Sequence, residues 1–218
     1  MLLSARGERV VSTDELTGVQ ALERKHPDLP LAPGKVQRRE FEYIRHGTRT
    51  FILSRDDVAS GHLLAPSCGP TRTEADFLAH VRGVVATDPE VPRWHFVVDN
   101  LDTHRSESLV RWVASESALL GIELGKKGKS GILKNRESRA AFLSEPSHRI
   151  VFHYTPKHSS WLNQIEIWLS ILVRKLLKRG SFTSVEDLKA KVLAFIDYYN
   201  RTMAKPFRWT YQGKPLVV

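Results

Sequence analysis

Apolar residues follow two different periodic patterns along this chain, and the patterns alternate from one end to the other. Short runs at 94–100 and 150–154 are rich in β-branched and aromatic residues and predict strands, the first of them buried on both faces. Residues from a cap at Thr71 or Thr73 to about 87, and from Ser106 to about 120, instead repeat apolar side chains at helical spacing. The chain therefore combines strands with helices.

The first 70 residues predict an antiparallel meander. Residues 9–15 are expected to form a short strand that ends in two acids, and the proline-containing stretch 22–35 is expected to be a connecting loop. Two adjacent strands are predicted on either side of a turn at His46 and Gly47, and a further strand at 62–68.

Pro156 ends the strand at 150–154, and a helix is predicted to begin after a cap at Ser159 or Ser160. Its apolar stripe consists of Ile165, Trp168, Leu169, Leu172 and Leu176. A last helix follows a cap within 181–184. The order of elements indicates an α/β fold with a mixed sheet flanked by helices, and it lacks the regular alternation of a Rossmann fold.

Glu166 lies off this apolar stripe, in line with Ser170, Val173 and Leu177 and beside Arg174. Packing against a core does not explain a carboxylate at that position. One interpretation is an acid in the first helical turn, favoured by the helix dipole. The other is an acid that binds a metal ion.

Composition and charge narrow the class of protein. The 218 residues are 41% hydrophobic and 26% charged, which fits a single globular domain over 1–218. A net charge of +9 and a pI near 9.8 favour a polyanionic partner. The single cysteine excludes an intramolecular disulfide, and neither a membrane-spanning run nor a signal peptide is present in the sequence. We therefore expect a cytoplasmic protein without a membrane partner.

Two common kinds of site are not supported by the sequence. The segment Gly128-Lys129-Ser130 resembles a phosphate-binding loop, but Glu123 stands where that motif needs its first glycine, so no nucleotide cofactor is expected. Four histidines, His104, His148, His153 and His158, have spacings that match no zinc-ligand pair.

Three acids remain in positions that suit metal chemistry: Asp14 and Asp99 at predicted strand ends and Glu166 on a predicted helix. Two Mg²⁺ ions about 4 Å apart need oxygen ligands and together activate both oxygens of a phosphodiester exchange. If the strands that carry Asp14 and Asp99 are neighbours, their carboxylates converge on one ion while Glu166 reaches the second. Mn²⁺ is expected to substitute for Mg²⁺.

Five segments surround these acids and the end of the chain: STDELTGVQALERKHP, REFEYIRHGT, VVDNLDTHRSESLV, HYTPKHSSWLNQIEIW and YNRTMAKPFRWTYQGKP. Together they resemble the catalytic domain of DDE transposases from bacterial insertion sequences related to the mariner group. The resemblance implies a ribonuclease-H-like fold, magnesium-dependent cleavage of DNA at transposon ends and strand transfer into target DNA. It matches Asp14, Asp99 and Glu166 to the catalytic acids and implies that Asn163 supports the active-site helix. It also implies a homodimer.

The separation between the second and third acids departs from that family pattern. Sixty-six residues lie between Asp99 and Glu166, more than in the better-known mariner-like enzymes, so spacing alone would nominate Glu137. Glu137 is surrounded by cations and no apolar helical stripe follows it, which favours a solvated charge. We keep Glu166 and interpret residues 121–147 as a basic insertion. Glu15 and Asp102 are lesser alternatives, and Asp102 is also a candidate helix cap.

Family members normally carry helix-turn-helix modules before the catalytic domain, and we expect this chain to lack them. DNA contacts are then expected from Arg174, Lys175, Lys178, Arg179, Lys126, Lys127 and Lys129. Two alternative functions stay open: a DNA-binding remnant that no longer cuts, and a ribonuclease-H-like nuclease that acts without transposition.

Overall fold

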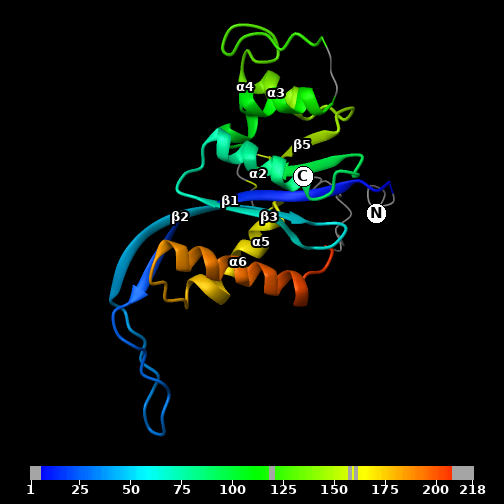
Figure 1. Ribbon diagram of the computed structural model, residues 1–218. Coiled ribbons are helices and arrows are strands. Elements are labelled where there is room, and N and C mark those ends of the chain that lie inside the picture. Colours follow the sequence, from blue (N-terminus) through cyan, green and yellow to red (C-terminus); the bar gives the residue numbers. More distant parts are fainter. Residues whose placement is uncertain (1–5, 118–120, 157–158, 160–161, 208–218) are drawn as a thin grey trace, which may run out of the picture.

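A five-stranded mixed sheet forms the centre of the protein in a computed structural model that describes residues 6–117, 121–156, 159 and 162–207 (Figure 1). The strands are β1 (Arg9–Arg24), β2 (Tyr43–Asp56), β3 (Leu63–Gly69), β4 (Trp94–Val98) and β5 (Ile150–Tyr154). They lie in the order β3-β2-β1-β4-β5, antiparallel from β3 to β1 and parallel from β1 to β5. The predicted α/β class with a mixed sheet is confirmed.

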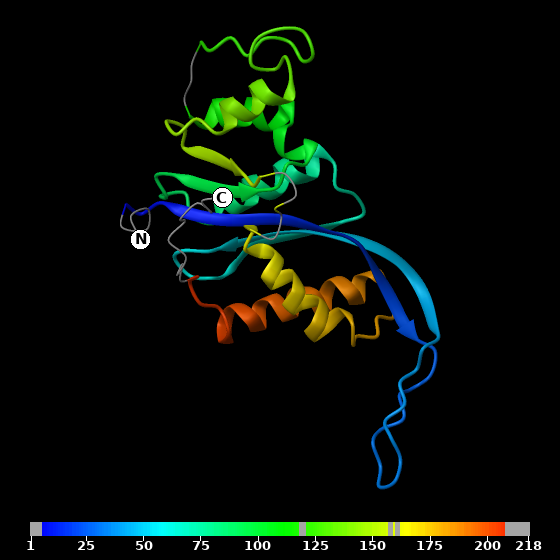
Figure 2. The same cartoon turned by 180° about the vertical axis from the view of Figure 1, so that it is seen from behind.

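Helices cover both faces of the sheet, as Figures 1 and 2 show from opposite sides. One face carries α2 (Glu74–Ala86), α3 (Glu107–Glu116) and α4 (Arg136–Leu143), and the other carries α5 (Ile165–Leu172), the π-helical turn η3 (Val173–Leu177) and α6 (Val185–Thr202). Each face has its own apolar core. Alternate side chains of β2 belong to the two cores: Ile52 packs under α2, while Phe51 and Leu53 pack against α5 and α6.

Local capping explains where several helices begin. Thr73 and Ser106 cap α2 and α3, and Ser184 caps α6, as the sequence predicts. The start of α5 was predicted wrongly: it begins at Ile165, its N-cap position is Gln164, and that residue makes no side-chain capping bond. Ser160 lies outside the described residues. Helix α3 ends at Glu116 and not near 120, although 118–120 are also outside the described part.

The N-terminal strands are longer than the sequence predicts. β1 continues past Asp14 and Glu15 to Arg24, so these acids lie inside a strand and not at its end. β2 runs through His46 and Gly47 without turning, since Gly47 adopts a φ of 115° that lets the strand bend. The turn lies instead between β1 and β2, in residues 25–42.

The far ends of β1 and β2, with residues 25–42, form a ribbon that projects from the body of the protein (Figures 1 and 2). Large apolar side chains on it stand in solvent, including Phe41 at 82% exposed and Leu31 at 77% exposed. Within the described ranges, no helix is both long and apolar enough to cross a membrane.

Candidate functional site

A cavity of about 650 Å³ lies where the middle of β1, the end of β4 and the outer side of α5 meet. Asp14, Asp99 and Glu166 all line it, although they come from three separate elements. β1 and β4 are parallel neighbours, with Ser12 paired to Val97, which places Asp14 and Asp99 two residues further along adjacent strands. The predicted convergence of the three acids is therefore present in the structure.

Asp14 has an environment that opposes its negative charge. Burial raises the pKa of its carboxyl group to about 7, with further increases from the nearby charges of Asp99, Glu166 and Glu15. The backbone N–H of Glu15 donates to Asp14 Oδ1 at 2.7 Å and offsets part of this effect. Carboxylates that raise one another's pKa in this way are a suitable donor set for a hard divalent metal ion.

Asp99 has the opposite environment because His104 lies beside it. His104 Nδ1 is 2.9 Å from Asp99 Oδ1, and the hydrogen bond from His104 is the main reason that the pKa of Asp99 is lowered. Nothing in the sequence pattern indicates this role, since four residues between an aspartate and a histidine match no established ligand spacing. His104 is a site residue that sequence reasoning missed.

Glu166 reaches the cavity from the first turn of α5, while Ile165, Trp168, Leu169 and Leu172 anchor the helix in the core. Ser170, Val173 and Arg174, which the sequence aligns with Glu166, line the same cavity. Asn163 is completely buried, and its Nδ2 donates to the backbone oxygen of Thr13 at 2.9 Å. This bond ties the start of the α5 segment to β1 next to Asp14.

The alternative acids occupy other places. Glu137 is exposed in the first turn of α4 and does not line the cavity. The sequence interpretation expected no apolar helical stripe after Glu137, but α4 continues beyond it and buries Phe142 and Leu143. Asp102 is 72% exposed, pairs with Arg136 at 2.7 Å, and caps no helix because Ser106 caps α3. Glu15 is buried and pairs with His104 at 3.0 Å.

The three acids line an open cavity and do not form a closed cage. Across the part of the chain that the structure describes, no three Asp, Glu, His or Cys side chains form a ready-made metal-ligand group. The oxygen-only chemistry of the carboxylates nevertheless fits Mg²⁺ or Mn²⁺, and the raised pKa of Asp14 shows that positive charge would be favourable there.

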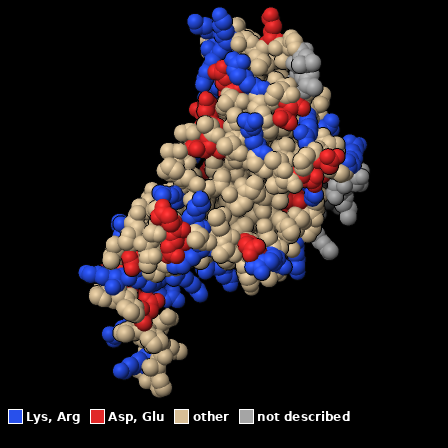
Figure 3. All heavy atoms as spheres, in the orientation of Figure 1, with Lys and Arg blue, Asp and Glu red and all other residues tan. Residues whose placement is uncertain are grey.

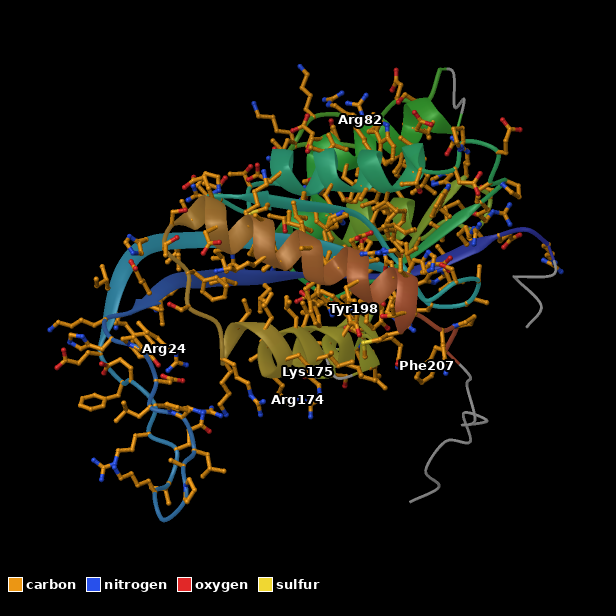
Figure 4. The ribbon with its side chains drawn as sticks, turned by 60° about the horizontal axis from the view of Figure 1, so that its bottom comes forward. Arg24, Arg82, Arg174, Lys175, Tyr198 and Phe207 are labelled. Atoms are coloured by element: carbon orange, nitrogen blue, oxygen red, sulfur yellow. The ribbon has the colours of Figure 1, made fainter. Side chains whose placement is uncertain are left out.

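The predicted DNA-contact cations lie on two separate parts of the surface. Arg174 lines the acidic cavity together with Arg72, and Figure 4 shows Arg174 and Lys175 projecting from the helix on the side away from α6. Lys178 and Arg179 are exposed just beyond η3. Lys126, Lys127 and Lys129 lie in the segment before α4, where Figure 3 shows basic side chains at the top of the view. The structure therefore does not bring all seven together.

Comparison with known proteins gives a family and a fold. Residues 9–189 match the family model described as "DDE superfamily endonuclease". Among solved structures, the pre-cleavage Mos1 transpososome is 15% identical with a TM-score of 0.53, covering 92% of this chain and 54% of that chain. The Mos1 transposase paired-end complex with left transposon end is 14% identical with a TM-score of 0.50, covering 90% and 51%.

No curated protein sequence matches this chain. The chain spans about half the length of the two Mos1 chains, and at these identities the likeness concerns the fold alone. The shared architecture is ribonuclease-H-like, the fold that the family resemblance implies.

Proposed function

The chain belongs to the DDE superfamily endonuclease family, and we propose that it is a transposase catalytic domain that cleaves DNA at transposon ends and joins them to target DNA. The observation that carries the proposal is the meeting of Asp14, Asp99 and Glu166 in one cavity. The two similar Mos1 structures, a transpososome and a paired-end complex, support the same function. Residues 121–147 would be an insertion between α3 and β5.

The acids would hold two Mg²⁺ ions, for which Mn²⁺ substitutes. When bound, divalent cations polarise the scissile phosphodiester and activate water or a DNA 3′-hydroxyl as nucleophile. The contribution of the chain is to keep the three carboxylates in place and to exchange the proton on Asp14 for a cation. A carboxyl group with a pKa of about 7 gives up that proton at little cost near neutral pH.

Cations around the cavity would hold the DNA. Arg72 and Arg174 line the cavity with the acids, so they would contact phosphates near the scissile bond. Lys175, Lys178 and Arg179 would extend this contact along the duplex. Lys126, Lys127 and Lys129 would contact a second, more distant stretch, such as target DNA.

We also propose that the protein works as a homodimer on two transposon ends. The exposed apolar side chains of the ribbon support this, because large apolar groups held away from the body mark a surface for another protein. By its family resemblance the chain would be the product of a bacterial insertion sequence that acts on DNA in the cytoplasm.

A cleavage assay tests the proposal. Duplex DNA bearing the ends of the source element is incubated with Mg²⁺ and wild-type protein, Glu166→Gln or Glu137→Gln. We expect cutting by the wild type and Glu137→Gln, and none by Glu166→Gln. Full activity of Glu166→Gln would overturn the assignment of the third acid.

Two other outcomes identify the alternative functions. Salt-dependent DNA binding without nicking in either Mg²⁺ or Mn²⁺ would indicate a remnant that no longer cuts. Nicking of arbitrary duplex or of an RNA–DNA hybrid at the same rate would indicate a nuclease without transposition activity.

A further inference from the structure

His104 lies completely buried between two carboxylates, Glu15 on β1 and Asp99 directly after β4. Its Nδ1 is 2.9 Å from Asp99 Oδ1 and 3.2 Å from the backbone oxygen of Asp99, and its Nε2 is 3.0 Å from Glu15 Oε1. Glu15 is itself only 3% exposed. Both ring nitrogens therefore face acceptors alone, and an imidazole satisfies such a pair only when both nitrogens carry hydrogen.

The contacts around the ring fix its orientation. Phe77 packs against the imidazole with ring centroids 4.2 Å apart, and Tyr154 Oη donates to the backbone oxygen of His104 at 2.9 Å. His104 thus stands behind the acidic cavity with both ring nitrogens engaged by oxygen acceptors.

Resting on the proposed function, we infer that His104 is a positioning residue that fixes Asp99 for metal binding, with Glu15 as its anchor. Asp99 Oδ1 accepts from the backbone N–H of Leu101 at 2.9 Å and faces His104. Within the described residues Asp99 Oδ2 has no hydrogen bond, so it is the oxygen left for a cation. Glu15 directly follows Asp14, so His104 also links the segment that carries Asp14 to Asp99.

This role differs from ordinary core packing because it acts through a ligand. Partners that orient a metal ligand typically change metal affinity about 10–100-fold when they are removed. A histidine that only filled space would change the stability of the fold and leave the affinity of correctly folded protein unchanged.

Direct Mn²⁺ binding, measured by electron paramagnetic resonance of the free ion, tests the inference without relying on cleavage. We expect His104→Ala to weaken binding about 10–100-fold. His80→Ala is the matched control. His80 is also buried, on α2, and its ring hydrogen-bonds Ser54 and Ser67 and none of the three acids. It should bind Mn²⁺ as the wild type does.

Further variants keep the test decisive. Glu15→Gln retains an acceptor for His104 but removes the buried charge. It should therefore fold and show a smaller loss of Mn²⁺ affinity than His104→Ala. If His104→Ala does not fold, the Mn²⁺ affinity of Glu15→Gln tests the inference instead. Wild-type affinity in the folded His104→Ala or Glu15→Gln protein, with binding lost in Asp99→Asn, would overturn the inference and leave the proposed function standing. Equal binding by wild type and Asp99→Asn would overturn both.

Discussion

The side-chain amide of Asn163 donates a hydrogen bond to the backbone oxygen of Thr13, a residue 150 positions earlier in the chain. Both groups are buried, and Thr13 immediately precedes Asp14. Glu166 lies one helical turn after Asn163, so this one bond relates the position of the third acid to that of the first.

Replacing Asn163 with Ala should therefore cost both stability and activity. Loss of a buried hydrogen bond that leaves a carbonyl unpaired corresponds to about 1–3 kcal/mol of unfolding free energy. We expect the cleavage rate to fall further than DNA affinity, because the acids shift while the surface cations do not. Denaturant unfolding and cleavage kinetics measure the two effects.

Asn200 provides a matched control for that experiment. Its side chain also ties a helix to a strand, through hydrogen bonds with the backbone N–H and oxygen of Leu63 at 2.9 and 3.0 Å, but away from the cavity. Asn200→Ala should lose similar stability while the remaining folded protein cuts DNA normally. Equal losses of cleavage in both variants would show that Asn163 acts only through general stability.

Asp14→Asn should stabilise the metal-free protein at pH 8. The folded carboxyl group has a pKa of about 7 against 3.8 ordinarily, so the folded protein keeps a proton that the unfolded chain loses as pH rises between these values. Stability therefore falls across this window and stays lower above it, by as much as about 4 kcal/mol at 1.36 kcal/mol per pH unit. Thermal unfolding with a chelator at pH 4 and pH 8 measures the difference.

At pH 4 the difference between the wild type and Asp14→Asn should be much smaller, because the carboxyl group is protonated in the folded protein and close to half protonated in the unfolded chain. Asp197→Asn, on the exposed side of α6, should change little at either pH. A destabilised Asp14→Asn at pH 8 would contradict the assignment of Asp14 as a carboxylate under repulsion.

The salt dependence of DNA binding should decrease when cations in η3 and directly after it are removed. Each lost phosphate contact lowers the slope of log affinity against log salt by about 0.9, so Arg174→Gln with Lys178→Gln should lower it by about 2. Fluorescence anisotropy across a salt series measures the slope. Lys191→Gln is the control, since Lys191 is engaged with Asp187 and the Ser181 carbonyl. An equal change of slope in Lys191→Gln would show that DNA does not bind specifically along Arg174 and Lys178.

Phe41→Asp should convert the proposed dimer to monomer. Phe41 is 82% exposed on the ribbon, and a charge at a protein interface would be buried without a partner. Sedimentation velocity measures the change. Tyr198→Asp, at a 52% exposed position on α6, should sediment as the wild type, and identical behaviour of both variants would show that the ribbon does not join two copies.

The sequence was most informative where one local signal decided the outcome. The buried run of β4, the caps Thr73, Ser106 and Ser184, and the position of Glu166 off the α5 stripe all follow from residues close together in the chain. These features were enough to predict a mixed sheet with helices, and the family resemblance added the three acids.

The remaining features depend on distant partners. β1 continues past Asp14 because β2 pairs with it as far as Tyr43, and a glycine that usually marks a turn serves as a bend when a neighbouring strand supplies hydrogen bonds. The pairing of His104 with Glu15 joins residues 89 positions apart, which no spacing rule detects. The segment before α5 is tied to β1 by the bond between Asn163 and Thr13, two residues 150 positions apart.

The chain order of the three acids also governs when the site can exist. Pairing of β1 with β4 can bring Asp14 and Asp99 together early in synthesis, but Glu166 belongs to α5, which follows β5. A nascent polypeptide on the ribosome therefore lacks the third carboxylate until α5 has emerged and docked. Incomplete translation products that stop before this helix should be harmless to the genome that encodes them.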